Sequence, residues 1–488
     1  MNVDDSAVIP LWMAARAEPA LVIDALRRIP AEEQSGDVEA VRTFASFRAG
    51  EVTASAALLT LDVVMETRPP RGAAEDLVLH LARSQLCRSL GRTEEAVTEV
   101  SAARAHLASV RHPHHRLALT ADVLVEEGLI RLVRGELAEA HDALFSATSL
   151  GVLPHATAQT AWAGIAVTTY IFGDPIDADA SLRRVDAGPS AGGTDAAALR
   201  DVAALLLAPE HGPSAEFHGI ADAVEPANAP APWGPLTIAT HGYFRARESQ
   251  FPEALEQIQR VASDLHGYWA EWVDMIRAFV HMRLGGIESG WKHLARVHAD
   301  DRHALCPYRE IAALRLRLND LPGAEAAISE CESIGDRHVP RSRMATQWLR
   351  AAVELRRGRS AESDLHADVA LLTMARNDTT GPMYFPPIDD IRALVARARA
   401  RGTALPLLDR IAALDDHSRL VQNFVALTPR ERDVLSLLSA GASGDRIADE
   451  LVLSRNTIKT HLRRVYSKLG ATSAQEAVRI ARWMGLDV

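Results

Sequence analysis

Basic side chains follow one face of a predicted helix near the end of the chain, and their spacing suits contact with nucleic acid. Residues 454–469 contain five Lys or Arg residues and no Asp or Glu. At helical spacing, Lys459, Thr460, Arg463 and Ser467 share one stripe. Lys and Arg can donate hydrogen bonds to guanine in a DNA major groove, and a Thr methyl can meet a thymine methyl. We therefore expect base contacts from Lys459, Thr460 and Arg463; the alternative is a solvated helix face.

The flanks of the same helix carry residues that suit the DNA backbone. Arg455, Thr457, Arg464 and Lys468 lie beside the stripe, where contact with phosphate is expected. Ser454 occupies the N-cap position and leaves amide groups of the first turn free to face a phosphate oxygen. These positions predict phosphate contacts around the base-contacting stripe.

Three further helices are predicted to position this helix. The apolar residues of its opposite stripe are Ile458, Leu462, Val465 and Leu469. Such a stripe must pack against a core. Capping boxes at Thr428–Glu431 and Ser473–Glu476 each begin a helix, and another helix precedes the turn at residues 452–454. Residues 427–488 therefore predict a compact domain of four helices.

Charge is distributed unevenly along the chain. The whole chain has a formal net charge of −11. Residues 427–488 contain ten basic and seven acidic residues, a net charge of +3, which leaves −14 on the other 426 residues. Two of the three lysines, Lys459 and Lys468, lie in the predicted basic helix. A basic module on an acidic body is typical of a protein that binds a polyanion through one segment.

A series of short motifs runs through this basic segment. They are Leu427-Thr-Pro-Arg-Glu-Arg-Asp-Val-Leu435, Ile447-Ala448, Leu453-Ser454, Thr457-Ile-Lys459-Thr-His461 and Lys468-Leu469-Gly470. The motifs closely resemble the C-terminal domain of LuxR-type transcriptional regulators, over about one eighth of the chain. The resemblance implies a four-helix, helix-turn-helix domain that binds DNA as a dimer.

The resemblance also assigns roles to single positions. It supports Lys459, Thr460 and Arg463 as base contacts, and it places Thr457, His461 and Lys468 at backbone-contact or framework positions. The last helix, residues 473–484, corresponds to the usual dimer surface. The residues expected in that surface are Val478, Ala481 and Arg482.

The chain departs from the family pattern at one point of the first motif helix. Gly444 and Asp445 stand where the family often has Asn and Lys. We expect the carboxylate of Asp445 to repel a DNA phosphate.

A repeat occupies the rest of the chain. Leu90-Gly91-Arg-Thr-Glu-Glu-Ala96 recurs at Arg134–Ala140 and at Phe172–Ala178. Weaker copies place Gly50, Ser249, Gly285, Asn319 and Gly358 five residues before a small residue. Successive anchors lie 41, 44, 38, 76, 36, 34 and 39 residues apart, and the interval of 76 corresponds to two units. These periods predict an all-α body of stacked helical hairpins, an α-solenoid that resembles degenerate tetratricopeptide repeats.

Interruptions of the repeat suggest the limits of the domains. We expect one sub-array over residues 1–205, a Pro/Gly-rich hinge over 206–235 and a second sub-array over 236–400. A linker helix is expected at 401–426, ending near Phe424 and followed by the DNA-binding domain at 427–488.

Aromatic residues are concentrated in the second sub-array. Nine of the 24 lie within residues 233–291. One hypothesis is a ligand pocket for a small, aromatic molecule; the alternative is ordinary packing between helices. The candidate lining residues are Tyr243, Tyr268, Trp269, Trp272 and Arg277.

Several classes of protein are excluded by missing motifs. No lysine follows a glycine, so a nucleotide-binding phosphate loop is absent. The first 291 residues contain no lysine, which excludes a phospho-receiver domain. His112-Pro-His114-His115 is a possible metal cluster, but a polar loop explains it better because no carboxylate or Cys is close in the sequence. We expect no catalytic activity, no metal and no cofactor.

The location also follows from composition. No stretch approaches the roughly 18 apolar residues of a membrane span, and Met1-Asn-Val-Asp-Asp5 lacks the basic start of a signal peptide. Cys87, Cys306 and Cys331 show no metal spacing and are expected to be buried thiols. A cytoplasmic protein without a membrane partner is therefore expected.

Two functions remain open. The first is a one-component transcription regulator that binds a palindromic operator in double-stranded DNA as a homodimer, with a small-molecule effector bound to the body. The second is a regulator whose body is a scaffold for a partner protein. With either function, RNA polymerase is a further candidate partner.

Overall fold

The protein is built from helices. The computed structural model describes residues 8–28, 36–67, 72–151, 153–185, 195–211, 216–226, 229, 231–248, 250–284, 286–298, 305–333, 339–377, 379, 385–403, 406–413, 427–469, 471 and 473–483. Every regular element in these ranges is a helix, which confirms the all-α fold class. The chain forms two compact units, Met1–His241 with Val261–Ala270, and Gly242–Arg260 with Glu271–Val488.

The repeat body contains 22 α-helices and two short 3₁₀ helices within the described ranges. Those of the first unit are α1 (Val8–Ala17), α2 (Pro19–Arg27), α3 (Gly36–Arg48), α4 (Ala54–Thr67), α5 (Ala73–Ser89), α6 (Thr93–His106), α7 (Pro113–Arg134), α8 (Leu137–Thr148), α9 (His155–Ile171), α10 (Pro175–Leu182), α11 (Asp195–His211) and α12 (Glu216–Ala223). The limits of the units fall within α13 (Gly234–Arg247), α14 (Phe251–Val261) and α15 (Tyr268–Arg283). The second unit continues with α16 (Ile287–Leu294), α17 (Pro307–Arg317), α18 (Leu321–Glu332), α19 (Pro340–Arg356), α20 (Ser360–Arg376), α21 (Ile388–Ala400) and α22 (Pro406–Ala413).

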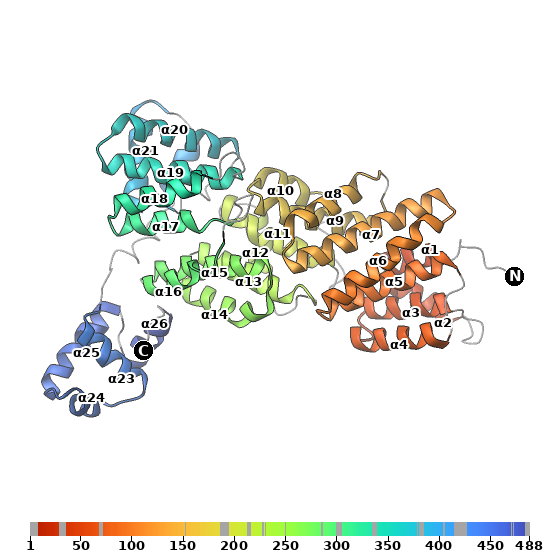
Figure 1. Ribbon diagram of the computed structural model, residues 1–488, viewed down its shortest axis with the longest axis horizontal. Coiled ribbons are helices and arrows are strands. Elements are labelled where there is room, and N and C mark those ends of the chain that lie inside the picture. Colours follow the sequence, from red (N-terminus) through yellow and green to blue (C-terminus); the bar gives the residue numbers. More distant parts are fainter. Residues whose placement is uncertain are drawn as a thin grey trace. The chain divides into compact units, whose positions relative to one another are not determined.

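Consecutive helices of the body pack as hairpins (Figure 1). In the first unit, α5 packs on α6, α7 on α8 and α9 on α10, while α6 contacts α7 and α8 contacts α9. In the second unit, α17 packs on α18 and α19 on α20, and α18 contacts α19. Each hairpin therefore buries its apolar face against its neighbours, which is the tetratricopeptide-like arrangement predicted from the repeat.

The repeat anchors end helices in the left-handed conformation. Those with a positive φ are Gly50 (75°), Gly91 (73°), Gly135 (76°), Gly173 (84°), Asn319 (58°) and Gly358 (75°). Glycine adopts this conformation without steric penalty, and Asn tolerates it better than most residues. The prediction that Gly or Asn ends a helix is thus confirmed at six anchors; Ser249 and Gly285 lie outside the described residues.

The small residue five positions after an anchor faces another small residue on the preceding helix. The Oγ of Ser84 donates to the carbonyl of Ala96 (3.1 Å), and the Oγ of Ser363 donates to the carbonyl of Ala351 (2.9 Å). A Cβ placed on Gly128 would lie 3.3 Å from the carbonyl of Ala140. In each pair the partners are twelve residues apart. Small side chains at both positions let the two helices of a hairpin approach closely.

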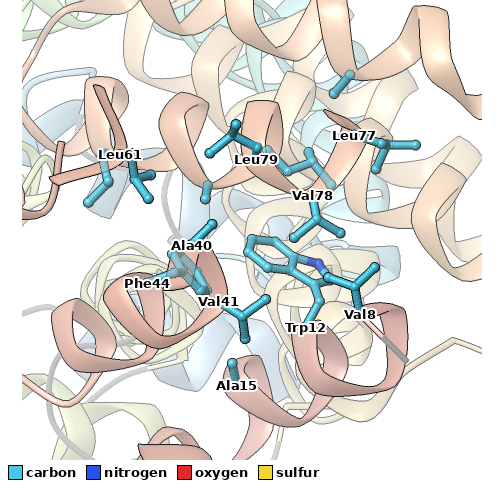
Figure 2. Packing of buried hydrophobic residues seen from close by; sticks show 14 of the residues in the cluster. Val8, Trp12, Ala15, Ala40, Val41, Phe44, Leu61, Leu77, Val78 and Leu79 are labelled. Carbon is cyan, nitrogen blue, oxygen red and sulfur yellow. The ribbon is translucent and has the colours of Figure 1, made fainter. Parts of the chain in front are cut away.

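The first hairpins enclose a continuous apolar core. Trp12 and Phe44 are both fully buried, and their rings stack with centroids 4.5 Å apart. Figure 2 shows this pair between Val8, Val41 and the side chains of α5. The indole Nε1 of Trp12 donates to Asp122 of α7 (3.0 Å), so the N-terminal helix is also tied to a later hairpin.

The predicted domain limits can be compared with the helix bounds. α11 crosses residue 205, and the expected hinge at 206–235 contains all of α12. α22 lies in the expected linker at 401–426, but residues 414–426 and the expected helix end near Phe424 lie outside the described residues. The limits of the sub-arrays therefore remain predictions.

All three cysteines are buried thiols, as expected. The Sγ atoms of Cys306 and Cys331 lie 3.5 Å apart. Among the described residues, no helix is both long enough and apolar enough to span a membrane.

Candidate nucleic-acid interface

Four capped helices form the C-terminal domain. They are α23 (Pro429–Ser439), α24 (Gly444–Leu451), α25 (Arg455–Leu469) and α26 (Ala474–Trp483). Both hydrogen bonds of the capping box between Thr428 and Glu431 are present. Ser443, Ser454 and Ser473 accept hydrogen bonds from the first turns of α24, α25 and α26. The helix starts predicted at Thr428, Ser454 and Ser473 are therefore confirmed.

The apolar stripe of α25 faces the core of the domain. Ile458 (1% exposed) packs with residues of α23 and α24, and Val465 (0% exposed) packs with Leu427, Leu435 and Ala481. Leu462 and Leu469 are partly buried against the same two clusters. This packing fixes the rotation of α25, so its opposite face must point to solvent.

The predicted base-contacting stripe lies on that exposed face. Lys459, Thr460, Arg463 and Ser467 are all exposed. The hydroxyl of Thr460 donates to the carbonyl of Asn456 (3.0 Å), which leaves its methyl group and its oxygen lone pairs available. Neither Lys459 nor Arg463 forms an ion pair within the described part of the chain. The stripe thus presents two unpaired cations and a hydroxyl.

The start of α25 is arranged around Ser454. Its Oγ accepts a hydrogen bond from the backbone N–H of Thr457 (3.1 Å) and lies 2.8 Å from the Thr457 Oγ1. Both side chains are therefore engaged in the cap, with the remaining first-turn amides left for a phosphate. Arg464 is exposed and has no ion pair among the described residues, which suits the predicted phosphate contact.

Arg455 has a partner that the sequence did not predict. Its Nε lies 2.9 Å from the Oδ1 of Asp445 on α24, and both side chains are largely exposed. Asp445, which was expected to repel phosphate, therefore forms an ion pair with Arg455, which was expected to bind phosphate. Because exposed ion pairs contribute only about 0–1 kcal/mol, a DNA phosphate can compete for Arg455.

Lys468 does not have the free position expected of a phosphate contact. Its Nζ lies 2.7 Å from the Oε2 of Glu431, whose side chain is only 3% exposed. Burial alone would raise the pKa of Glu431, but the hydrogen bonds from Lys468 and Thr428 outweigh it and hold the pKa below its ordinary value. Lys468 therefore has a partner within the domain, which suits a framework position, and its contact with phosphate remains a prediction.

His461 is half-buried on the side of α25. Its Nδ1 is buried without a hydrogen-bond partner within the described residues. Only the other ring nitrogen could reach a phosphate, so the expected contact of His461 remains a prediction.

The expected dimer residues on α26 differ in exposure. Val478 is half-buried, and the side chain of Arg482 lies outside the described part of the structure. Ala481 is fully buried in the domain's own core with Leu435 and Val465. Its assignment to the dimer surface was therefore wrong, because a methyl group buried inside the domain cannot contact a partner.

The aromatic residues proposed as a ligand pocket have partners within the chain. The indole of Trp269 donates to the carbonyl of Leu132 (2.6 Å), and the ring of Trp272 packs on Tyr243 with centroids 5.5 Å apart. The ring of Tyr268 packs on Trp269, and Arg277 pairs with Asp274. Trp269 and Trp272 are buried, and none of the five residues lines the cavity beside Trp291 and Tyr308 or the cavity beside Arg48 and Arg88. These contacts support packing between helices.

The histidine cluster is a loop and helix start. His112 precedes α7, and the rings of His112 and His115 lie 5.3 Å apart. Within the described ranges, no group of three His, Cys, Asp or Glu side chains could hold a metal ion.

Besides the pair of Arg455 and Asp445, two further features of the domain were not predicted from the sequence. One is the pair formed by Lys468 and Glu431, which are 37 residues apart. The other is Val452, which joins α24 to α25 with a left-handed φ of 53° and is 88% exposed. A β-branched residue rarely adopts this conformation, so local preference does not predict it at Val452. The pair of Lys468 and Glu431 joins two different helices, so local sequence does not predict it either.

Two helices joined by a short turn, with a capped second helix that exposes a basic stripe, define a helix-turn-helix DNA-binding domain. Residues 425–481 match the family model described as "Bacterial regulatory proteins, luxR family". The C-terminal domain is therefore a luxR-family helix-turn-helix domain.

Comparisons with single proteins agree over this domain. The chain is 52% identical over 56 residues to the HTH-type transcriptional regulators MalT of Serratia proteamaculans and Yersinia pestis. The similarity covers 12% of this chain and 6% of the length of each regulator, so it concerns the domain alone. Among solved structures, the crystal structure of the APC/C hetero-tetramer Cut9-Hcn1 has a TM-score of 0.37 and 10% identity, covering 84% of this chain and 87% of that one.

Proposed function

We propose that the protein is a cytoplasmic transcription regulator that binds double-stranded DNA through residues 427–488 and takes its input from the helical-repeat body. The observation that carries the proposal is the exposed stripe of α25, where Lys459 and Arg463 are unpaired among the described residues. A helix with this pattern fits the major groove, where such side chains donate to guanine. The protein acts as a homodimer on a palindromic operator, and it is not an enzyme.

Control by the body requires differential affinity. An effector changes DNA binding only if it binds the DNA-competent and the incompetent forms with different affinities. In this proposal the helical-repeat body carries the effector site. The aromatic cluster offers no support for an aromatic effector, because its side chains pack against one another.

The experiment begins with a genome-wide footprint that identifies bound sites. Fluorescence anisotropy then measures the affinity of the full chain for one such site as salt is varied. The logarithm of affinity should fall steeply with the logarithm of salt concentration, because counterions are released from the DNA. A response independent of salt would contradict direct binding.

Matched variants locate the interface. The double variant Lys459→Ala/Arg463→Ala removes two exposed cations of α25 and should abolish preference for the footprinted site. The control Arg28→Ala/Arg116→Ala removes two exposed cations of the first unit and should bind like the unmodified protein. Sedimentation with a full palindrome tests the homodimer: each palindrome should carry two chains, and one chain per palindrome would contradict it.

A second candidate function is a scaffold for a partner protein. It is favoured by an exposed apolar stripe on α20, where Leu365, Val369 and Leu372 are 63%, 42% and 62% exposed. Apolar residues at this spacing suit contact with another protein. Replacing Leu365 and Leu372 with Gln should leave DNA binding by the purified protein unchanged and abolish regulation in cells; regulation that persists would exclude this stripe.

A further inference from the structure

A cavity of about 410 Å³ lies inside the first unit of the body. It is bounded by the end of α3, the turn to α4, the last turn of α5 and the first residue of α11. Its volume is within the range of small-molecule sites. Its wall contains the side chains of two arginines, Arg48 and Arg88, together with Gln85 and Asp195.

Arg88 is held rigidly in this wall. The side chain is 1% exposed, and its guanidinium donates to Glu126 (2.9 and 3.1 Å) and to both carboxylate oxygens of Asp195 (3.0 Å each). Asp195 also accepts a hydrogen bond from the indole of Trp233 (2.7 Å). The acceptors around Arg88 are therefore occupied by structural bonds.

Arg48, the second arginine of the wall, takes part in none of these bonds. Its Nε is buried without a hydrogen-bond partner, and the side chain forms no ion pair with any described residue. Burial lowers the pKa of Arg48, Asp195 opposes the effect, and the charges of Arg16 and Arg88 add to it. Although the Arg48 side chain as a whole is half-buried, its desolvated Nε–H without a hydrogen-bond partner is unfavourable, and an anion entering the cavity would supply the missing acceptor.

The nearby carboxylates do not hydrogen-bond to Arg48, because their bonds within the described residues go to other donors. Asp122 is bound by Arg16, Trp12 and Thr157. Glu126 is bound by Arg88 and Ser84. The region holds three arginines, at positions 16, 48 and 88, and three carboxylates, at positions 122, 126 and 195. Each carboxylate accepts hydrogen bonds from groups other than Arg48, so the donors of Arg48 have no acceptor among the described residues.

The rest of the lining narrows the class of ligand. Gln85 is 5% exposed, and its side-chain amide has no hydrogen-bond partner among the described residues. It can bind a second oxygen of the same anion. Phe47, Val52 and Leu90 supply an apolar side to the cavity. A bare inorganic ion would leave that side unused.

We infer that this cavity is a binding site for a small organic anion, a carboxylate or phosphate on an apolar group, held by Arg48 and Gln85. Arg48 pairs with the anion, Gln85 donates to it, and the apolar group lies against Phe47, Val52 and Leu90. The assignment of this ligand as the effector rests on the proposed function; the binding site itself does not.

Isothermal titration of the full chain without DNA tests the site. The probes are benzoate, phenyl phosphate, inorganic phosphate and the neutral analogue benzamide, at constant ionic strength. Benzoate or phenyl phosphate should bind saturably, and benzamide should not. Arg48→Gln should weaken the binding about tenfold or more, since it removes a charge-assisted hydrogen bond. The control Arg116→Gln removes an exposed, unpaired cation of the same unit and should bind as before.

Other results would overturn the site. It fails if neither organic anion binds, if benzamide binds equally well, or if Arg48→Gln binds like the unmodified protein. Inorganic phosphate binding as tightly as phenyl phosphate would refute the apolar side of the site. If the site stands, the tighter binding of benzoate or of phenyl phosphate shows whether it prefers a carboxylate or a phosphate.

The stability of a second variant provides an independent readout. Arg48→Met removes the charge and breaks no hydrogen bond within the described residues. The melting temperature of the protein should therefore be unchanged or higher. A marked drop would mean that Arg48 has a structural partner, and would overturn the proposal. Anisotropy with operator DNA and the bound anion then tests the effector role: unchanged DNA affinity refutes that role while the site stands.

Discussion

The ammonium of Lys468 at the end of α25 lies 2.7 Å from the buried carboxylate of Glu431 in the first turn of α23. Glu431 also accepts a hydrogen bond from the backbone N–H of Thr428 (2.8 Å). One carboxylate therefore caps α23 and holds the last turn of α25 against it. The orientation of the exposed stripe depends on this junction.

Replacing Lys468 with Ala should loosen the junction. The change leaves Glu431 buried without its cation, at a cost of about 1–3 kcal/mol. In hydrogen exchange of the full chain, the amides of α23 and α25 should exchange at least about fivefold faster, since 1.4 kcal/mol is a factor of ten. Arg464→Ala, an exposed change on the same helix, should leave exchange nearly unaltered. Equal effects from both variants would contradict a framework role for Lys468.

The same junction predicts a dependence on pH. The pKa of Glu431 is held below its ordinary value, so the stabilisation is present above the unfolded pKa of about 4.3. It is lost as the pH falls through the lower pKa of the folded state. Glu431→Gln should therefore be less stable than the unmodified protein at pH 6, and the difference should shrink below about pH 4. Hydrogen exchange of α23 at several pH values measures it; a constant difference would exclude titration of Glu431.

Val452 should tolerate replacement by Gly with a gain in stability. Its left-handed φ of 53° costs a residue with a side chain about 1–2 kcal/mol. Glycine avoids that cost but loses more conformational entropy on folding. The net gain should be about 0.5–1 kcal/mol, visible as slower exchange in α24. Val452→Ala keeps the strained backbone and serves as the control, which should gain little.

Asp445→Asn should strengthen DNA binding. The change removes a negative charge from the helix that precedes α25 and frees Arg455, its partner at 2.9 Å. An exposed pair of this kind contributes about 0–1 kcal/mol, so the affinity should rise up to about fivefold, more at low salt than at high salt. Asp433→Asn makes the same charge change on α23, where Asp433 pairs with Arg430, and should have a smaller effect. An unchanged affinity for Asp445→Asn would place α24 away from DNA.

Two adjacent arginines should behave differently in binding assays. Arg463→Ala should cost about 1–3 kcal/mol on the specific site and little on random DNA, as expected for a base contact. Arg464→Ala should weaken both complexes alike and reduce the salt slope by about one. If the two variants exchanged these signatures, the rotation of α25 in the groove would have to be revised.

The sequence predicted those features that depend on neighbouring residues. Ser454 could be placed as a cap and Ile458 in a buried stripe because both follow from helical spacing. The pairs Lys468–Glu431 and Arg455–Asp445 could not be predicted, since each joins different helices. The aromatic cluster shows the same limit. The indole of Trp269 bonds to Leu132, 137 residues away, so proximity along the chain did not indicate which aromatic residues would meet.

The paired small residues of the hairpins have a consequence for how the body can vary. The helices approach closely at Ser84 and Ala96, and at Gly128 and Ala140, because these residues have small side chains or none. The close approach of the two helices therefore makes little demand on the side chains that face away from the apolar core. A buried charge such as Arg48, or an exposed leucine such as Leu365, can be carried by one hairpin without altering the next. The body can acquire new chemistry one repeat at a time while its backbone stays the same.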